Sequence, residues 1–243
     1  MENIWCKYSP NYLERLRLDY ELDSLAEGRE TCFDRILAVA EWVSRLWEHV
    51  SNGEPVKREP YCILEQVIKH GKRFRCVEYG IVTAGCLNAL GIPARSVALK
   101  TEDSETRDNG AGHVVCEAYD TDRESWMCVD VQCGAVPLLS GEPLSACSFG
   151  RALREHRGEL SVKWINNRYE MSDGKYFSWI EDYLFYLDAV CWAGGKGRRI
   201  MFVPEGGKEI KVFQKKYKVE VDRYLRDEAD FYSFDPERVL ADG

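Results

Sequence analysis

The stretch GKRFRCVEYGIVTAGCLNALGIPAR, from Gly71 to Arg95, decides the fold. Three cations lie within the four residues before Cys76, and no proline follows Cys76 until the stop signal Gly91-Ile92-Pro93. The sequence therefore predicts a helix from Cys76 to Gly91, with Cys76 in or next to its first turn. Unpaired N–H groups and the positive end of the helix dipole favour a thiolate at that position. Gly80 and Gly85 lower helix propensity, which indicates that another element packs closely against this helix.

The composition limits the classes of protein to consider. The chain has 243 residues, of which 45% are hydrophobic, and a formal net charge of −8. This acidic balance argues against a nucleic-acid partner, which would require a basic face. No apolar run approaches the roughly 18 residues of a spanning helix, and the first residues lack the order of a signal peptide. We therefore expect a cytoplasmic protein without a membrane partner.

The ten cysteines are expected to be free thiols, because disulfides are rare in a reducing cytosol. Most should serve as small buried hydrophobic residues. Cys62, Cys86, Cys128 and Cys191 have bulky apolar neighbours, which keep a thiol inert. Cys76 differs from them because it follows a basic loop at the start of a helix. It is our candidate nucleophile.

A thiolate nucleophile needs a base, and His113 is the best placed of the four histidines. It begins GHVVCEAYD, an alternating β-branched segment that predicts a strand from Gly112 onward. The period of two places His113, Val115 and Glu117 on one face of that strand. His49 ends an amphipathic helix expected over residues 33–50 and is interpreted as a cap or solvent residue. His70 and His156 lie among charges and are expected to be exposed.

The next segment, SWMCVDVQC, predicts a second strand that follows a short polar turn. Its alternation places Trp126, Cys128, Asp130 and Gln132 on one face. Because the turn is short enough for a hairpin, Asp130 can lie across from the His113 end of the first strand. A carboxylate there would accept a hydrogen bond from the imidazole and orient it toward the thiol.

These segments resemble the transglutaminase-like superfamily, which has a papain-like Cys-His-Asp fold. The resemblance rests on CVEYGIVTAGCLNALGIPAR, on the strand GHVVCEAY and on the Trp-x-x-x-Asp strand that ends at Asp130, and it covers roughly residues 33–140. It implies an α+β fold with the nucleophile helix packed on an antiparallel sheet. It also implies that Cys76 is the nucleophile, His113 the general base and Asp130 the orienting carboxylate. Phe74, where the family often has glycine, and Val131 after the aspartate depart from the family pattern.

Residues 1–140 are expected to form the catalytic core with its N-terminal helices. Residues 141–243 add two aromatic-rich segments, which predict a further helix and strands packed on that core. The glycine cluster between them, Gly194 to Gly197, lacks the Walker pattern of a nucleotide loop and is interpreted as a turn. The two parts are expected to form one structural unit.

The oxyanion donors are less defined by the sequence. The backbone N–H of Cys76 is one candidate, because a helix start leaves this group without an intrahelical partner. Gln132 and Gln66 are the candidate side-chain donors. For both, an ordinary surface or supporting amide is the alternative interpretation.

The sequence predicts no cofactor. A zinc site made from His113, Cys116, Cys128 and Cys133 is disfavoured, since strand residues three apart point to opposite faces. The acidic stretch from Thr101 to Asp108 lacks the spacing of a calcium loop.

We therefore expect acyl transfer through a thioester, with an amide, peptide or acyl-carrier substrate. Hydrolysis is favoured, and transfer of the acyl group to an amine is the alternative. A catalytically inactive binding module is the second alternative.

Overall fold

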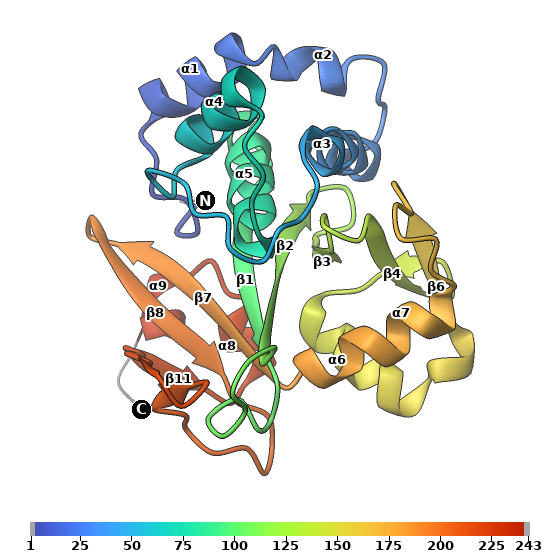
Figure 1. Ribbon diagram of the computed structural model, residues 1–243, viewed down its shortest axis with the longest axis vertical. Helices are drawn as coiled ribbons and strands as arrows, with labels where there is room; N and C mark the ends of the chain where they lie inside the picture. The colour runs from blue at the N-terminus through green and yellow to red at the C-terminus, as the bar shows by residue number, and fades with distance from the viewer. Residues whose placement is uncertain (1–2, 241–243) are drawn as a thin grey trace.

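The helix predicted after Cys76 is present and lies at the centre of the molecule (Figure 1). The computed structural model describes residues 3–240. Five helices precede the first strand in this part of the chain: α1 (Pro10–Asp19), α2 (Leu22–Ala26), α3 (Cys32–Leu46), α4 (Pro60–His70) and α5 (Cys76–Ala89). None of the helices in residues 3–240 is both long enough and apolar enough to cross a membrane.

The main sheet contains six strands in the order β11-β8-β7-β1-β2-β3. Their bounds are β1 (Ala94–Lys100), β2 (Gly112–Asp120), β3 (Ser125–Val129), β7 (Tyr186–Ala193), β8 (Lys196–Phe202) and β11 (Arg223–Leu225). Neighbouring strands are antiparallel, except that β11 runs parallel to β8. The prediction of an α+β fold with the nucleophile helix on an antiparallel sheet is therefore confirmed, since α5 packs on β1 and β2.

The remaining elements follow β3 in the chain. Two small sheets consist of β4 (Ala135–Leu139), β5 (Glu142–Pro143) and β6 (Leu160–Trp164), and of β9 (Val212–Phe213) and β10 (Tyr217–Lys218). The helices are α6 (Ala146–Glu155), η1 (Arg157–Glu159), α7 (Asp173–Ile180), η2 (Glu181–Tyr183), α8 (Glu228–Phe231) and α9 (Pro236–Leu240). Strands β7, β8 and β11, all from residues after 141, extend the same sheet that holds β1 and β2.

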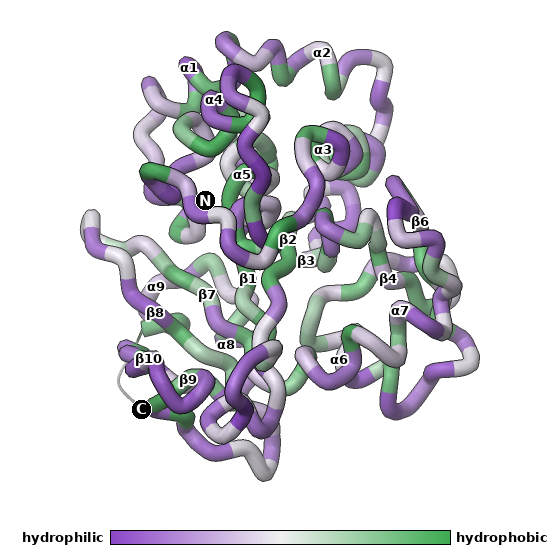
Figure 2. Tube along the Cα trace, viewed as in Figure 1, coloured by the Kyte–Doolittle hydropathy of each residue, from purple (hydrophilic) through white to green (hydrophobic). Residues whose placement is uncertain are grey.

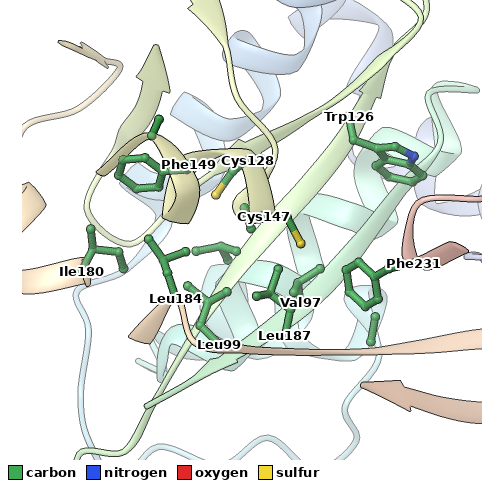
Figure 3. Close-up of a cluster of buried hydrophobic side chains, with 14 of the residues drawn as sticks. Val97, Leu99, Trp126, Cys128, Cys147, Phe149, Ile180, Leu184, Leu187 and Phe231 are labelled. Atoms are coloured by element: carbon green, nitrogen blue, oxygen red, sulfur yellow. The ribbon is translucent and has the colours of Figure 1, made fainter. Parts of the chain in front are cut away.

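Two hydrophobic cores lie on the two faces of the main sheet. One core joins α1, α3, α4 and α5 to the sheet through residues such as Ile36, Val82 and Cys116. The other joins β1 and β7 to α6, α7 and α8, and Figure 3 shows Leu99, Phe149 and Phe231 within it. Figure 2 shows hydrophobic segments along α5 and the central strands. Both faces of the sheet are therefore covered at its centre.

The glycines of α5 permit the close packing that the sequence indicated. A Cβ atom at Gly80 would lie 2.7 Å from Oγ of Ser96, and one at Gly85 would lie 2.2 Å from Cγ of Pro60. Real side chains do not tolerate such approaches. The helix thus meets the sheet at Gly80 and α4 at Gly85, and the prediction of a close neighbour is confirmed.

Three local expectations differ from the structure or are refined by it. The helix expected over residues 33–50 ends at Leu46, because Trp47 turns to an extended conformation and stacks on Tyr79. Strand β3 ends at Val129, and Gln132 lies in the turn that leads to β4 rather than on the strand. The glycine cluster forms the predicted turn, between β7 and β8, where Gly194 and Gly195 have positive φ.

Candidate active site

The structure brings Cys76, His113 and Asp130 together. Cys76 is the first residue of α5 and is partly exposed. His113 lies on β2, and its Nε2 is 2.9 Å from Oδ2 of Asp130. Cys76 also contributes to the raised pKa of this imidazole, so the thiol lies beside the ring. The three groups therefore form a connected series of thiol, imidazole and carboxylate.

Strand register explains how Asp130 reaches His113. The pairing between β2 and β3 extends to Cys116 and Val129, and Asp130 follows directly. Asp130 then forms an antiparallel bridge with Ala135, so it begins the tight connection from β3 to β4. Its side chain lies just past the paired segment, on the face of β2 that carries His113.

Two further groups hold the Asp130 carboxylate. The backbone N–H of Cys133 donates to Oδ1 at 3.1 Å, and the hydroxyl of Tyr176 lies 3.3 Å from Oδ2. Burial opposes ionisation of Asp130, but the charge and hydrogen bond of His113, together with the hydrogen bonding of Cys133, outweigh it, so the pKa of the carboxyl is lowered. Asp130 is thus held as a fully buried carboxylate with a fixed orientation.

His113 is correspondingly stabilised as an imidazolium. Burial alone would lower its pKa, but the charge and hydrogen bond of Asp130, with a smaller contribution from Cys76, raise the pKa to about 10. The imidazole therefore carries a proton that it can deliver to a leaving group.

The basic loop before Cys76 has a different role from the expected one. Arg73 pairs with Glu48 at 3.3 Å, and Arg75 pairs with Glu54 at 3.0 Å. The N–H of Arg75 also donates to the buried Glu78 carboxylate, which completes a capping box at the start of α5. These cations anchor the helix start, and His113 is the cation that faces the thiol.

The two candidate amides lie in different surroundings. Gln66 makes its hydrogen bonds locally, to the carbonyl oxygen of Cys62 at 3.0 Å and to the N–H of Val56 at 3.4 Å. None of its described hydrogen bonds reaches the three central residues. Gln132 lines a pocket of about 300 Å³ together with Cys133 and Tyr169, and its buried Oε1 has no hydrogen-bond partner among the described residues. Gln132 therefore lies in the region of the triad and remains the candidate side-chain oxyanion donor, whereas Gln66 does not.

Several residues of this region were not predicted from the sequence. The rings of His113 and Trp179 are 5.0 Å apart in an edge-to-face arrangement, and Tyr183 lies 6.0 Å from His113. His49, expected to be a cap or solvent residue, is half-buried in the wall of the pocket. Burial and the charge of His113 lower the pKa of His49.

His49 reaches the pocket because α3 ends early. The N–H of Val50 donates to the carbonyl oxygen of Phe74 at 3.1 Å, which ties the extended segment to the loop before Cys76. Phe74, the departure from the family pattern, is buried edge-to-face against Trp47. The expected exposure of His70 and His156 is confirmed.

The cysteines mostly follow the prediction. All ten are free, and seven are buried: Cys32, Cys86, Cys116, Cys128, Cys133, Cys147 and Cys191. Cys62 is partly exposed, contrary to its apolar sequence context, because it lies toward the surface side of α4. Within residues 3–240, no three His, Cys, Asp or Glu side chains are grouped so that they could hold a metal ion.

Fold and site together define a protein with a Cys-His-Asp centre at the start of a helix. Residues 22–131 match the sequence profile of the transglutaminase-like superfamily, so this part of the chain is similar to that superfamily. This match supports cysteine-dependent chemistry at amide bonds as the general class of reaction. A comparison with curated proteins gives no match.

Solved structures similar to this chain have low identity. The periplasmic domain of TgpA from Pseudomonas aeruginosa is 18% identical, over 51% of this chain and 44% of that chain, with a TM-score of 0.36. Red sea bream transglutaminase is 14% identical, over 82% of this chain and 34% of that chain, with a TM-score of 0.38. Calcium-bound LapG from Legionella pneumophila is 14% identical, over 72% of this chain and 98% of that chain, with a TM-score of 0.36. This chain thus spans less than half of the first two structures.

Proposed function

We propose that the protein cleaves an amide or peptide bond through a thioester on Cys76. The observation that carries the proposal is the connected series of Cys76, His113 and Asp130, with a thiol that is partly exposed. The fold alone would not carry it, since one fold hosts many functions. We also propose a cytoplasmic location, on the cysteine content of the sequence.

Each of the three residues has a distinct role in this reaction. The Cys76 thiolate attacks the carbonyl carbon, and the new oxyanion is stabilised by the backbone N–H of Cys76, with Gln132 as the candidate side-chain donor. The His113 imidazolium gives its proton to the leaving amine, and the C–N bond breaks to leave a thioester. Asp130 keeps the imidazole oriented throughout.

Water completes the reaction. Neutral His113 removes a proton from the water, which attacks the thioester carbonyl and releases the acid and the thiolate. An amine in place of water would give a new amide, because both reactions share the first step. No observation on this chain favours the amine, so hydrolysis is the proposed outcome.

Selective alkylation tests the nucleophile. A limiting dose of iodoacetamide near pH 6 should modify Cys76 first, because this thiol is partly exposed at a helix start and lies beside the His113 imidazolium. Activity should fall in step with this single modification, followed by peptide mapping and by turnover of an acyl-substrate library with and without amines. In His113→Ala, Cys76 should react more slowly.

Cys6 and Cys62 provide matched controls, since they are the other partly exposed cysteines. Cys6→Ser and Cys62→Ser should retain wild-type labelling of Cys76 and wild-type turnover. Labelling of Cys6, Cys62 or Cys133 ahead of Cys76 would show that the nucleophile is assigned wrongly. Selective labelling of Cys76 without turnover of any acyl substrate would instead favour an inactive binding module.

A further inference from the structure

The pocket beside the triad, which we call the side pocket, has wall residues that contact His113 and Asp130. Trp179 in its wall lies edge-to-face against His113, and Cys133 in its wall donates its N–H to Asp130. Cys133 also lies close enough to Cys76 for the thiolate charge to raise its pKa, in addition to the dominant effect of burial. A group bound in the side pocket would therefore lie next to a carbonyl attacked by Cys76.

The side pocket has an apolar and largely aromatic wall. Trp179, Tyr169 and Met171 provide that surface. Trp179 is fixed from behind by Tyr176, at a ring distance of 6.1 Å, and by Tyr183, at 5.5 Å. An aromatic wall held in this way can receive a flat ring by stacking or edge contact without first being ordered.

The volume limits what the side pocket can hold. At about 300 Å³ it is at the lower end of the range for small-molecule sites. It can therefore enclose one large side chain or an equivalent substituent rather than a whole cofactor.

The charges around the side pocket exclude one class of group. The described residues that line it include one cation, Lys175, and no carboxylate. The neighbouring carboxylate, Asp130, is fully buried and paired with His113. A cationic substituent would thus meet Lys175 and the His113 imidazolium without a compensating anion.

We propose that the side pocket binds an apolar, preferably aromatic, group next to the scissile carbonyl of the acyl donor, and that it disfavours cationic groups. This inference rests on the proposed function, in which Cys76 attacks that carbonyl. Trp179 and Tyr169 are the specificity-determining residues.

The test uses chloromethyl ketones of N-acetylated phenylalanine, alanine and lysine, which place each side chain next to the carbonyl that a thiolate approaches. Mass spectrometry gives the rate of Cys76 alkylation by each reagent, relative to the rate with iodoacetamide. The phenylalanine reagent should react about 10- to 100-fold faster than the alanine reagent, because ring burial is worth roughly that factor. The lysine reagent should be no faster than the alanine reagent.

Substitutions in the wall should remove this preference. Trp179→Ala and Tyr169→Ala should each reduce the phenylalanine-to-alanine ratio at least threefold, with both rates taken relative to iodoacetamide in the same variant. Trp179→Phe should retain most of the phenylalanine-to-alanine ratio. This result would show that the loss in Trp179→Ala comes from the missing ring and not from a general loss of structure. Trp192→Ala is the matched control, because Trp192 is a half-buried tryptophan on β7 that contacts Lys7, and it should leave the ratio unchanged.

The outcomes separate this inference from the proposed function. A ratio near one in the wild type, a ratio unaffected by both wall substitutions, or a fast lysine reagent would overturn the pocket assignment. These ratios do not depend on turnover. Failure of the proposed function would show as unselective alkylation of Cys76 by iodoacetamide or as absent turnover.

Discussion

Strand β2 carries two buried ionisable side chains on one face, and their surroundings differ. His113 and Glu117 are four residues apart, and each forms an ion pair with a residue of a neighbouring strand or its extension. His113 pairs with Asp130 at 2.9 Å, and Glu117 pairs with Arg95 at 2.8 Å. By distance and burial alone the two pairs are nearly equivalent.

The Arg95–Glu117 pair is saturated by protein groups. Glu117 also accepts from the N–H of Ala146 at 2.8 Å and from the hydroxyl of Tyr232 at 2.7 Å. The Arg95 guanidinium lies over the ring of Trp5 at 4.1 Å and over three further aromatic rings, those of Trp126, Phe231 and Tyr232. This pair joins the N-terminal segment, the sheet and the C-terminal helices. The thiols beside it, those of Cys128 and Cys147, are buried.

The His113–Asp130 pair has nearly the same N···O distance, but an accessible thiol and a pocket lie beside it. Cys76 lies against His113 and is partly exposed, and the side pocket begins at Trp179. The comparison teaches that a buried charge pair does not by itself mark a reactive centre. An accessible nucleophile and space for a substrate distinguish the two.

Asp130→Ala should produce the largest change in turnover among variants of the two pairs. The imidazole loses its orienting partner, so turnover should fall by about two to four orders of magnitude. The fold should be retained, because His113 can become neutral when its partner is absent. Steady-state kinetics measures the change, and circular dichroism checks the fold. Turnover within threefold of wild type would show that Asp130 has no part in the mechanism. The two ion pairs would then not differ in function.

Arg95→Met should affect stability instead of chemistry. The substitution leaves Glu117 buried without its cation, which should lower the free energy of unfolding by about 3–5 kcal/mol. Urea denaturation measures this loss, and turnover per folded molecule should remain near the wild-type value. The double variant with Glu117→Gln should regain part of the stability, because the uncompensated charge is gone. A drop in turnover without a drop in stability would show that the Arg95–Glu117 pair also serves the reaction.

Local patterns in the sequence predicted the placement of Cys76 and His113 well. The stop signal and the basic entry loop fixed the ends of the helix that begins at Cys76, and alternation fixed the face of β2 that carries His113. These features depend on residues that are neighbours in the chain. The same local reasoning misplaced Gln132, because strand β3 stops where Asp130 turns the chain toward β4.

Long-range packing supplied what the sequence did not reveal. Tyr176 and Trp179 reach the triad from α7, more than 40 residues after Asp130, through a core that no local pattern defines. His49 reaches the side pocket because Trp47 stacks on Tyr79 and ends α3 early. In each case the position depends on a partner distant in sequence.

The pH dependence of stability gives the smallest expected difference between the two pairs. In the folded protein the pKa of His113 is raised to about 10, because the charge of Asp130 outweighs burial, whereas an unfolded histidine titrates near 6.5. The folded state thus binds one more proton than the unfolded state between these values. Stability from this pair is complete below about pH 6.5 and is lost as pH rises toward 10, with a slope of at most about 1.4 kcal/mol per pH unit.

Urea denaturation from pH 7 to pH 9 in a Cys76→Ser background measures this slope without titration of the nucleophilic thiol. Adding His113→Gln should make the curve less steep, because one titrating group is removed, while the buried cysteines, whose pKa values are raised by burial, contribute equally to both proteins. Adding Arg95→Met together with Glu117→Gln should shift the whole curve down with its slope unchanged, since neither replacement side chain titrates. Equal slopes with and without His113 would mean that the imidazole is neutral in the folded protein. It could not then be the proton donor to the leaving group.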